Sequence, residues 1–566
     1  MKAIRNKTFF YLFLALCLTC SLMLIKKTTI IEDLTQSILP RKLFESSKKN
    51  YICEKAGDRL TDKYKTDFQE ETIKTEKLSD AQQAIIDFAR HSSYSNIKPY
   101  VKKCAIFIVF IVLDIIFIFL WITYCSCCCC GCGLFRASET SRLCAMIWYI
   151  ISCVSYLLVI IVSIVTLSLL NSFFARINGL GCSAFYFIDH VRYGLAPSYT
   201  NRQNEWTGIE GIIERLEYTD TQREDIKDKS NSLSSEINGK SNQYSSVCQN
   251  EYNSLKSNAQ TVNDLIGQSF DELTTDEAIS DLRDVQTNFD DADKDLVDNY
   301  YDAMHDHTNK LAKRINKAIF TLTLIFAIAG IVLLTLHIIF DFCLIKVLYI
   351  IVWNISMLLM FISILLAAIF GILGYILGDA VEVGNYILST ENLHNKDPLI
   401  FDPSDNNSYI SNIVDVCANG DGNFTKVIEG GEALNEKLSE WNANKEEYEQ
   451  AKENINCGDE AKTNELKGYY DELLAIVEQS LNMSYNITNV SCSFAKNDKN
   501  ILLNEVDTGG IKGLGLCACS FLVGIGLLIS VLSGIILVHK YNCKCSKGQI
   551  RGPNNQINES NVNIAQ

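Results

Sequence analysis

The fold is decided by the stretch CAIFIVFIVLDIIFIFLWITYCSCCCCGC, which runs from Cys104 to Cys132. Its first part, residues 104–124, carries one charged side chain, Asp114. About 20 apolar residues cross the ~30 Å hydrocarbon core of a bilayer as a helix, and inside lipid an open-ended segment satisfies its backbone only as a helix. The stretch therefore predicts a membrane-spanning helix that is followed directly by a cysteine-rich turn.

Four more apolar blocks repeat this pattern. They predict further spans at residues 145–170, 318–340, 347–377 and 511–538. The chain has 566 residues, of which 48% are hydrophobic, and these are gathered into the blocks, which excludes a single soluble globule. We expect an all-α membrane protein with five spans.

The N-terminus resembles a secretory signal. An apolar run from Phe9 to Ile25 follows Lys2, Arg5 and Lys7. This basic flank and short run predict a signal peptide over residues 1–25 that is removed. No A-x-A cleavage motif follows the run, so an uncleaved anchor, which would give six spans, remains the alternative.

The spacing between the spans is uneven. Segments 125–144 and 341–346 are short, whereas 171–317 and 378–510 are long. Two helical hairpins therefore carry both large loops on one side of the membrane. The segment 26–103 is expected on that same, extracellular side, and the tail 539–566 on the cytoplasmic side.

Sequons and dispersed cysteines both favour the extracellular side for the large loops. The second loop holds five N-x-S/T sequons, at Asn406, Asn423, Asn482, Asn486 and Asn489. The N-terminal segment and the loops hold six cysteines that are disulfide candidates, Cys53, Cys182, Cys248, Cys417, Cys457 and Cys492. Pairing within each loop would join Cys182 to Cys248 and two of the last three to each other, leaving one for Cys53, but six cysteines allow many connectivities.

A second kind of cysteine cluster lies at the ends of the spans. The lipidation candidates are Cys125, Cys127, Cys128, Cys129, Cys130, Cys132, Cys543 and Cys545. Crowded cysteines at a reducing membrane edge suit S-palmitoylation, because each acyl chain can enter the adjacent bilayer. Unmodified thiols and a metal site are the alternatives, but structural zinc sites use separated cysteine pairs, so we predict no metal or cofactor.

The basic residues do not decide the orientation. Lys98, Lys102 and Lys103 precede the first span, and Lys313, Arg314 and Lys317 precede the third, all on the side of the large loops. Basic residues in the short loops and in the tail balance them, so the positive-inside test is neutral.

The large loops have the pattern of long helices. Residues 198–397 contain no proline, and apolar side chains recur at steps of three, four or seven. One stripe, which we assign to a single helix, runs through Leu233, Ile237, Tyr244, Val247, Leu255, Val262, Ile266, Phe270 and Leu273. A second runs through Leu434, Leu438, Trp441, Tyr448, Ile455, Leu466, Tyr469, Leu473, Ile476 and Leu481. We expect the two loops to form an elongated helical bundle that continues the membrane helices outward, with segment 26–103 as a third helical element.

This order of segments, together with C-S-C-C-C-C-G-C at Cys125 to Cys132, resembles the prominin family over essentially the whole chain. The resemblance implies a non-enzymatic glycoprotein of the plasma membrane that binds sterol-rich lipid and shapes protrusions such as cilia or microvilli. The asparagine-rich tail, which ends in I-A-Q, departs from the family, so no tail partner is inferred. A tweety-like anion channel or lipid-transfer protein is the alternative, and an adhesion receptor is a weaker one.

A few residues inside or beside the spans are candidates for lipid or ion contact. Asp114 should face other helices or be protonated, and a hydrogen bond to a buried polar group such as Asn354 or His337 is the simplest role for it. Two short sterol-contact patterns, which are weak evidence, include Lys346 and Tyr349 in one case and Tyr541 and Lys544 in the other. Gly374 and Gly378 form a G-x-x-x-G step that permits close helix packing.

The remaining motifs exclude some functions. No Walker loop, G-x-S-x-G or H-E-x-x-H motif occurs, so we predict no enzyme activity. A net charge of −15 argues against a nucleic-acid partner. The expected partners are membrane lipids, cholesterol or a related sterol among them, and self-association into a homo-oligomer is left open.

Overall fold

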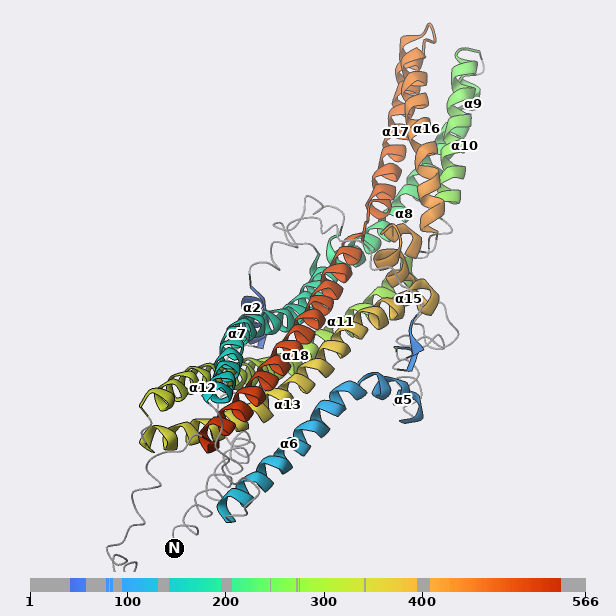
Figure 1. The fold of residues 1–566 in the computed structure, drawn as a ribbon. Helices are drawn as coiled ribbons and strands as arrows, with labels where there is room; N and C mark the ends of the chain where they lie inside the picture. The colour runs from blue at the N-terminus through green and yellow to red at the C-terminus, as the bar shows by residue number, and fades with distance from the viewer. Residues whose placement is uncertain are drawn as a thin grey trace, which may run out of the picture.

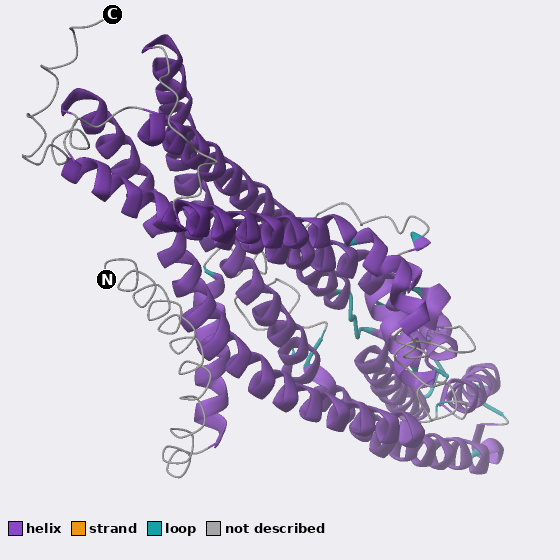
Figure 2. Ribbon diagram, turned by 60° about the horizontal axis from the view of Figure 1, so that its bottom comes forward, coloured by secondary structure: helices purple, strands orange, loops and turns teal. Residues whose placement is uncertain are grey.

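The structure is a computed structural model. It describes residues 41–57, 78–80, 82–84, 94–130, 142–194, 206–244, 246–270, 273, 275–340, 343–393, 408–428 and 430–540. The expected signal peptide and most of the cytoplasmic tail lie outside these ranges. The described residues are almost entirely helical and contain no named strand, only an isolated bridge between Asn423 and Ser491 (Figure 2). The all-α prediction is therefore confirmed.

Five helices are long and apolar enough to cross a membrane, which makes the chain a multi-pass membrane protein. They are α6 (Ala105–Cys130), α7 (Arg142–Tyr193), α12 (Lys313–Phe340), α13 (Cys343–Ile387) and α18 (Phe494–Lys540). Each contains one of the predicted apolar blocks, so the expectation of five membrane-spanning helices is confirmed by length and composition. They lie together at one end of an elongated molecule (Figure 1).

Several of these helices are longer than their apolar blocks. α7 and α13 continue past residues 170 and 377, and α18 begins well before residue 511. No proline stops them, and the extensions still bury apolar side chains such as Phe173 and Phe185. The short connections are correspondingly shorter than expected, because α6 runs through Cys130 and α13 already begins at Cys343.

The two large loops build one stalk at the other end of the molecule (Figure 1). Its four long helices are α8 (Gly208–Gly239), α10 (Gln249–Phe270), α16 (Gly431–Asn454) and α17 (Glu460–Thr488). The two hairpins share one hydrophobic core, in which Phe270 of the first loop stacks on Trp441 of the second at 6.3 Å between ring centroids. The described parts of both loops are therefore helical, and their placement outside the cell stays a prediction.

The stripe from Leu233 to Leu273 does not form one helix, which corrects the sequence-based assignment. α8 ends at Gly239, a short α9 (Ser241–Tyr244) follows, and the chain turns back so that α10 begins at Gln249. The apolar spacing survives because both arms of the hairpin face the same core. At the turn Tyr244 stacks on Tyr252 at 5.1 Å, and Cys248 has a positive φ of 67°.

The part of the molecule between the five membrane-spanning helices and the stalk is also helical. α11 (Thr275–Asp302), the π-helix η2 (Ala303–Ala312) and α12 form one uninterrupted path into the membrane part. α2 (Arg41–Ala56) packs against α7, and α5 (Tyr94–Lys103) leads into α6. The short elements of the second loop are α14 (Thr390–Leu393), α15 (Ser408–Val414), η3 (Asp415–Asn419) and η4 (Phe424–Val427).

α13 and α18 touch through their backbones where the spans meet the stalk. A Cβ added to Gly374 would lie 2.7 Å from the backbone nitrogen of Leu514, and one added to Gly510 would lie 2.8 Å from the nitrogen of Gly378. Neither position has room for a side chain, since contacts this short do not occur for real Cβ atoms. The predicted packing role is confirmed for Gly374, whereas Gly378 contributes only its backbone, against Gly510, an additional member that the sequence reading did not identify.

We expect Gly374→Ala and Gly510→Ala each to destabilise the protein by about 1–3 kcal/mol, because the added methyl group forces two backbones apart. Gly378→Ala is the matched control, since nothing lies within 4 Å of its Cβ position. This change should be neutral or should stabilise by up to about 1 kcal/mol. Thermal unfolding of the full chain in detergent will rank the three variants, and a loss of stability for Gly378→Ala equal to the others would contradict the assigned crossing.

Candidate functional site

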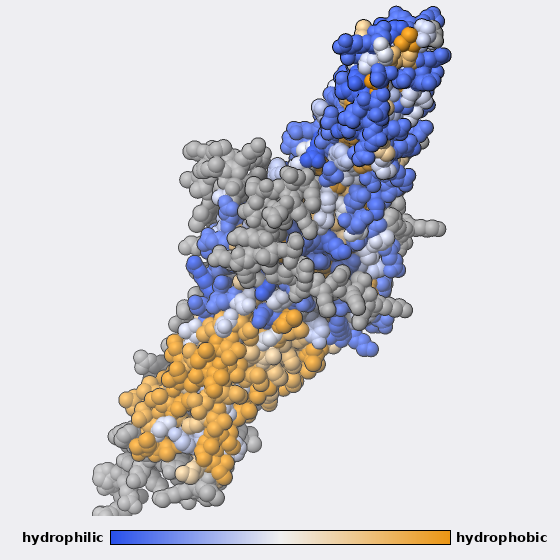
Figure 3. Space-filling view, turned by 90° about the horizontal axis from the view of Figure 1, so that it is seen from above, coloured by the Kyte–Doolittle hydropathy of each residue, from blue (hydrophilic) through white to orange (hydrophobic). Residues whose placement is uncertain are grey.

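The first functional surface is a belt of exposed apolar side chains on the five long helices. Figure 3 shows it as a continuous hydrophobic region at one end of the molecule, with a hydrophilic stalk at the other. Side chains as large as Phe119 and Leu344 are 66% and 70% exposed there. A soluble protein does not expose apolar surface on this scale, so the belt is the surface that lipid covers.

The helix α6 lies at the edge of the bundle and contributes most to this belt. It packs against α13 and α18 through one face, which carries several aromatic side chains and the buried Asp114. Phe107 sits over Gly371, where an added Cβ would come within 2.1 Å of its ring, and Phe110 stacks on Phe521 at 4.5 Å. The rest of α6 faces outward, so this span has the largest lipid contact for its length.

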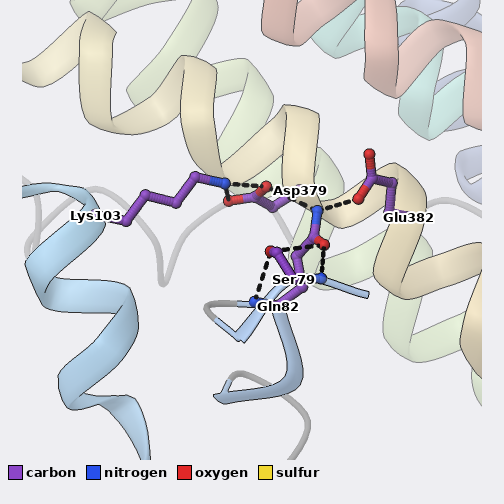
Figure 4. A network of polar contacts seen from close by, with 5 residues as sticks. All are labelled: Ser79, Gln82, Lys103, Asp379 and Glu382. Carbon is purple, nitrogen blue, oxygen red and sulfur yellow. Dashed lines mark hydrogen bonds and ion pairs between the residues drawn. The ribbon is translucent and has the colours of Figure 1, made fainter. Parts of the chain in front are cut away.

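A network of polar contacts lies at the edge of the belt that faces the stalk (Figure 4). Lys103, at the end of α5, donates to both carboxylate oxygens of Asp379 on α13, at 2.6 and 2.9 Å. Gln82 donates to Asp379 at 3.1 Å and also to Glu382. The amide of Gln82 is held in place by Ser79, whose backbone nitrogen and hydroxyl both donate to it at 2.9 Å.

The network ties three distant parts of the chain together at the depth where the first span begins and the fourth span ends. Its central carboxylate, Asp379, is 7% exposed, so it needs the ammonium group of Lys103 as a partner. That ammonium group also lies 5.4 Å from the ring centroid of Tyr375. Burial and the nearby Asp379 carboxylate raise the pKa of Tyr100, which keeps this phenol neutral.

A second network fixes α2 against the extensions of α7 and α11. Lys49 pairs with Asp189 at 2.7 Å and with Asp293 at 2.9 Å. Burial opposes the charge on Lys49, but hydrogen bonds to these two carboxylates outweigh it and raise the pKa of Lys49. Arg192 also pairs with Asp293, at 2.9 Å, so two cations converge on this buried carboxylate.

The six predicted cysteines form three disulfides, and their pairing partly corrects the sequence-based expectation. The bonds are Cys53–Cys182, Cys248–Cys457 and Cys417–Cys492. The expected pair within the second loop is confirmed by Cys417–Cys492. The expected pair Cys182–Cys248 is wrong, and Cys53 bonds to Cys182 rather than to a cysteine of the second loop.

The reason for this correction is distance along the stalk. Bridged cysteines need Cα atoms within about 7 Å of each other. α8, which separates Cys182 from Cys248, has 32 residues and therefore extends roughly 48 Å. Cys248 is carried to the tip of the stalk, where it meets Cys457 at the tip of the other hairpin, whereas Cys182 stays near α2.

The glycosylation candidates gather on one part of the stalk. Asn482 and Asn489 are exposed and Asn486 is partly exposed, all near the end of α17. The side-chain oxygen of Asn423 accepts from the backbone nitrogen and hydroxyl of Thr425 and so caps η4. Asn406 lies outside the described ranges.

Of the lipidation candidates, the structure describes only the backbone of some. Residues 125–130, which include Cys125, Cys127, Cys128, Cys129 and Cys130, continue helix α6 rather than forming the expected loop. Cys132, Cys543 and Cys545 lie outside the described ranges. Their acylation stays a prediction.

The candidates for sterol and ion contact need correction in two places. Tyr349 is 1% exposed and packs inside the bundle, so its side chain is not on the lipid-facing surface, and its contact with sterol stays a prediction. Lys346 is partly exposed, and Tyr541 and Lys544 lie outside the described residues. Asp114 is buried as expected, but Asn354 is not its partner, because the amide of Asn354 donates to the carbonyl of Ile350 in its own helix.

The network around Asp379 was missed at the level of sequence. From the sequence, Lys103 was considered only as one of the basic residues that precede the first span. No role was predicted for Asp379 or Gln82. The available signal was position, because Lys103 directly precedes the first predicted span and Asp379 follows the fourth by two residues. Opposite charges at the ends of two spans are natural partners once both spans end at the same membrane surface.

Comparison with known proteins adds no identification. No protein-family model matches the chain, and a search of curated proteins found no match.

We expect Lys103→Met to destabilise the protein by about 1–3 kcal/mol. Leaving a fully buried charge unpaired costs about 3–5 kcal/mol, and the partial exposure of Lys103, 30%, lowers this figure. The double variant Lys103→Met/Asp379→Leu should recover most of the loss, because neither charge remains. Lys102→Met, at an exposed neighbour, is the control. Thermal unfolding of the purified full chain measures all four proteins, and equal stability of the Lys103 and Lys102 variants would refute the assigned role of the ion pair.

Proposed function

We propose that this chain is a prominin-like membrane organiser, which binds sterol-rich lipid and shapes or stabilises plasma-membrane protrusions such as cilia or microvilli. The observation that carries the proposal is the physical continuity between the belt and the stalk. α7, α13 and α18 run without a break from the belt into the part of the molecule next to the stalk, and α11, η2 and α12 form a fourth continuous path there. A lipid-facing bundle joined stiffly to a long projection can hold neighbouring membrane in a fixed geometry.

The chemistry of the stalk supports an extracellular position for it. Three disulfides in the large-loop side favour an oxidising, extracellular environment. The exposed sequon asparagines at the end of α17 favour the same side. The stalk would then project away from the cell, and the cysteine cluster at residues 125–132 would face the reducing cytoplasm.

One observation favours the alternative, a tweety-like anion channel or lipid-transfer protein. Asp114 is 6% exposed in the middle of α6, and its Oδ1 atom has no hydrogen-bond partner within the part of the chain that the structure describes. An intramembrane carboxylate of this kind is costly and is often functional. A lone carboxylate does not make a conduction path, so the organiser is the proposal we favour.

The proposed sidedness predicts that the stalk carries N-glycans. Endoglycosidase treatment of the protein from its own cells should increase its gel mobility. This shift should shrink when Asn482, Asn486 and Asn489 are changed to Gln, while changes at the non-sequon residues Asn442, Asn454 and Asn456 should leave it unchanged. A stalk that is unglycosylated, reduced and inaccessible to added protease in intact cells would place it in the cytoplasm and contradict the proposal.

The proposed function predicts that the tagged full-length protein concentrates in protrusions and that its deletion shortens them or reduces their number. The variant Cys248→Ser/Cys457→Ser, which unties the two stalk hairpins but keeps the five spans, should reach the membrane and restore protrusions only partly. An even distribution over flat membrane, with unchanged protrusions after deletion, would overturn the proposal. Ion flux or lipid exchange by the purified protein in liposomes, lost in Asp114→Asn, would favour the alternative instead.

A further inference from the structure

We propose that a cluster of cations at the stalk-side edge of the belt binds the phosphate group of a phospholipid headgroup. We call it the α12 basic cluster, and it consists of Lys55 on α2 and Lys313, Arg314 and Lys317 on α12. The proposal requires only that the belt lies in a bilayer, and it is independent of any role in protrusions.

Within the described residues, the three cations of the cluster that lie on α12 have no acidic partner. Lys313 and Lys317 are four residues apart on one helix, so they share a face, and the charges of both Lys317 and Lys55 act on Lys313. Within the described ranges, Lys313, Arg314 and Lys317 form no salt bridge. Repulsion of this kind is relieved by an anion that enters from outside the chain.

The acidic groups nearest along the chain are already engaged or face solvent. Asp306, the one carboxylate of η2, pairs with Lys310 at 3.0 Å and with His305 at 2.8 Å. Glu54 pairs with Lys55 at 3.4 Å, but its side chain is 76% exposed, so this contact is weak. Neither carboxylate neutralises the cations on α12.

The position of Lys55 is fixed by two separate links from α2. The neighbouring Cys53 is bonded to Cys182 of α7, and Lys49 is held by Asp189 and Asp293. Lys55 itself lies 5.4 Å from the ring centroid of Tyr51. Tyr51 in turn packs on His305 of η2, with 4.9 Å between the ring centroids, so α2 holds Lys55 beside the helix that leads into α12.

The depth of the cluster identifies the anion. Ile315, between Arg314 and Lys317, is 43% exposed, and Leu322, about two turns further, is 45% exposed. The cations therefore lie where the apolar belt begins, which is the depth of the headgroup phosphates. Ammonium and guanidinium groups are the usual donors to phosphate oxygens, and the guanidinium of Arg314 can donate twice. A phospholipid, unlike a soluble phosphate, also covers the apolar side chains below.

The test is native mass spectrometry of the purified full chain in detergent, titrated with dioleoyl phosphatidylglycerol, with dioleoylglycerol of the same tails, and with glycerol phosphate. We expect phosphatidylglycerol to bind more tightly than either of the others. Lys313→Gln should weaken its binding about fivefold, since each cation near a charged membrane surface contributes a factor of about five. The triple variant Lys313→Gln/Arg314→Gln/Lys317→Gln should weaken it by on the order of a hundredfold.

The matched control is Arg215→Gln/Lys256→Gln/Lys467→Gln, which removes the same charge from stalk helices far from the belt. It should bind phosphatidylglycerol like the unmodified protein. Equal loss in both triple variants would show a nonspecific charge effect and overturn the site, as would unchanged binding by the α12 variant. Equal affinity for glycerol phosphate would overturn the assignment to lipid. Size-exclusion profiles that match the unmodified protein confirm that each variant is folded.

Discussion

The whole arrangement depends on a bilayer covering the exposed apolar faces of five helices. Inside lipid the backbone must satisfy itself, and uninterrupted helices do so. Buried hydroxyl groups in the bundle follow the same constraint, because Thr166 and Ser530 donate to the carbonyls of Val162 and Gly526 four residues earlier in their own helices. Association of the helices then rests on close packing, which explains why glycines line the crossing of α13 and α18.

The helices do not end where the lipid ends, and this is what couples the belt to the stalk. At the boundary, the glycine crossing brings α13 and α18 into backbone contact, and the pair Lys103–Asp379 joins α5 to α13 directly beside it. The disulfide Cys53–Cys182 and the ion pair of Lys49 with Asp189 attach α2 to α7. A change in helix tilt inside the bilayer is therefore carried by continuous helices into the part of the molecule that lies between the belt and the stalk.

The sequence predicted the helical class, the five spans and most of the stalk core, because apolar periodicity reports burial directly. It could not predict where a helix turns back. The apolar stripe through Leu233, Tyr244 and Leu255 keeps its spacing across a hairpin, so the spacing gave no indication of the turn before Cys248. The disulfide pairing failed for the same reason, since it depends on which hairpin tips meet. The ion pair of Asp379 and the buried position of Tyr349 depend on how the helices are rotated against each other, which side-chain packing decides and a single sequence does not display.

The distribution of charge separates the two ends of the molecule. The chain has a net charge of −15, yet cations gather at the edge of the belt on α5 and α12. α17 alone has 29 residues and extends roughly 44 Å, whereas electrostatic interactions in physiological salt decay over about 8 Å. The carboxylates of the distal stalk are therefore too far away to weaken an attraction between these cations and lipid phosphates. The cations at the belt and the carboxylates of the distal stalk are therefore electrostatically separate.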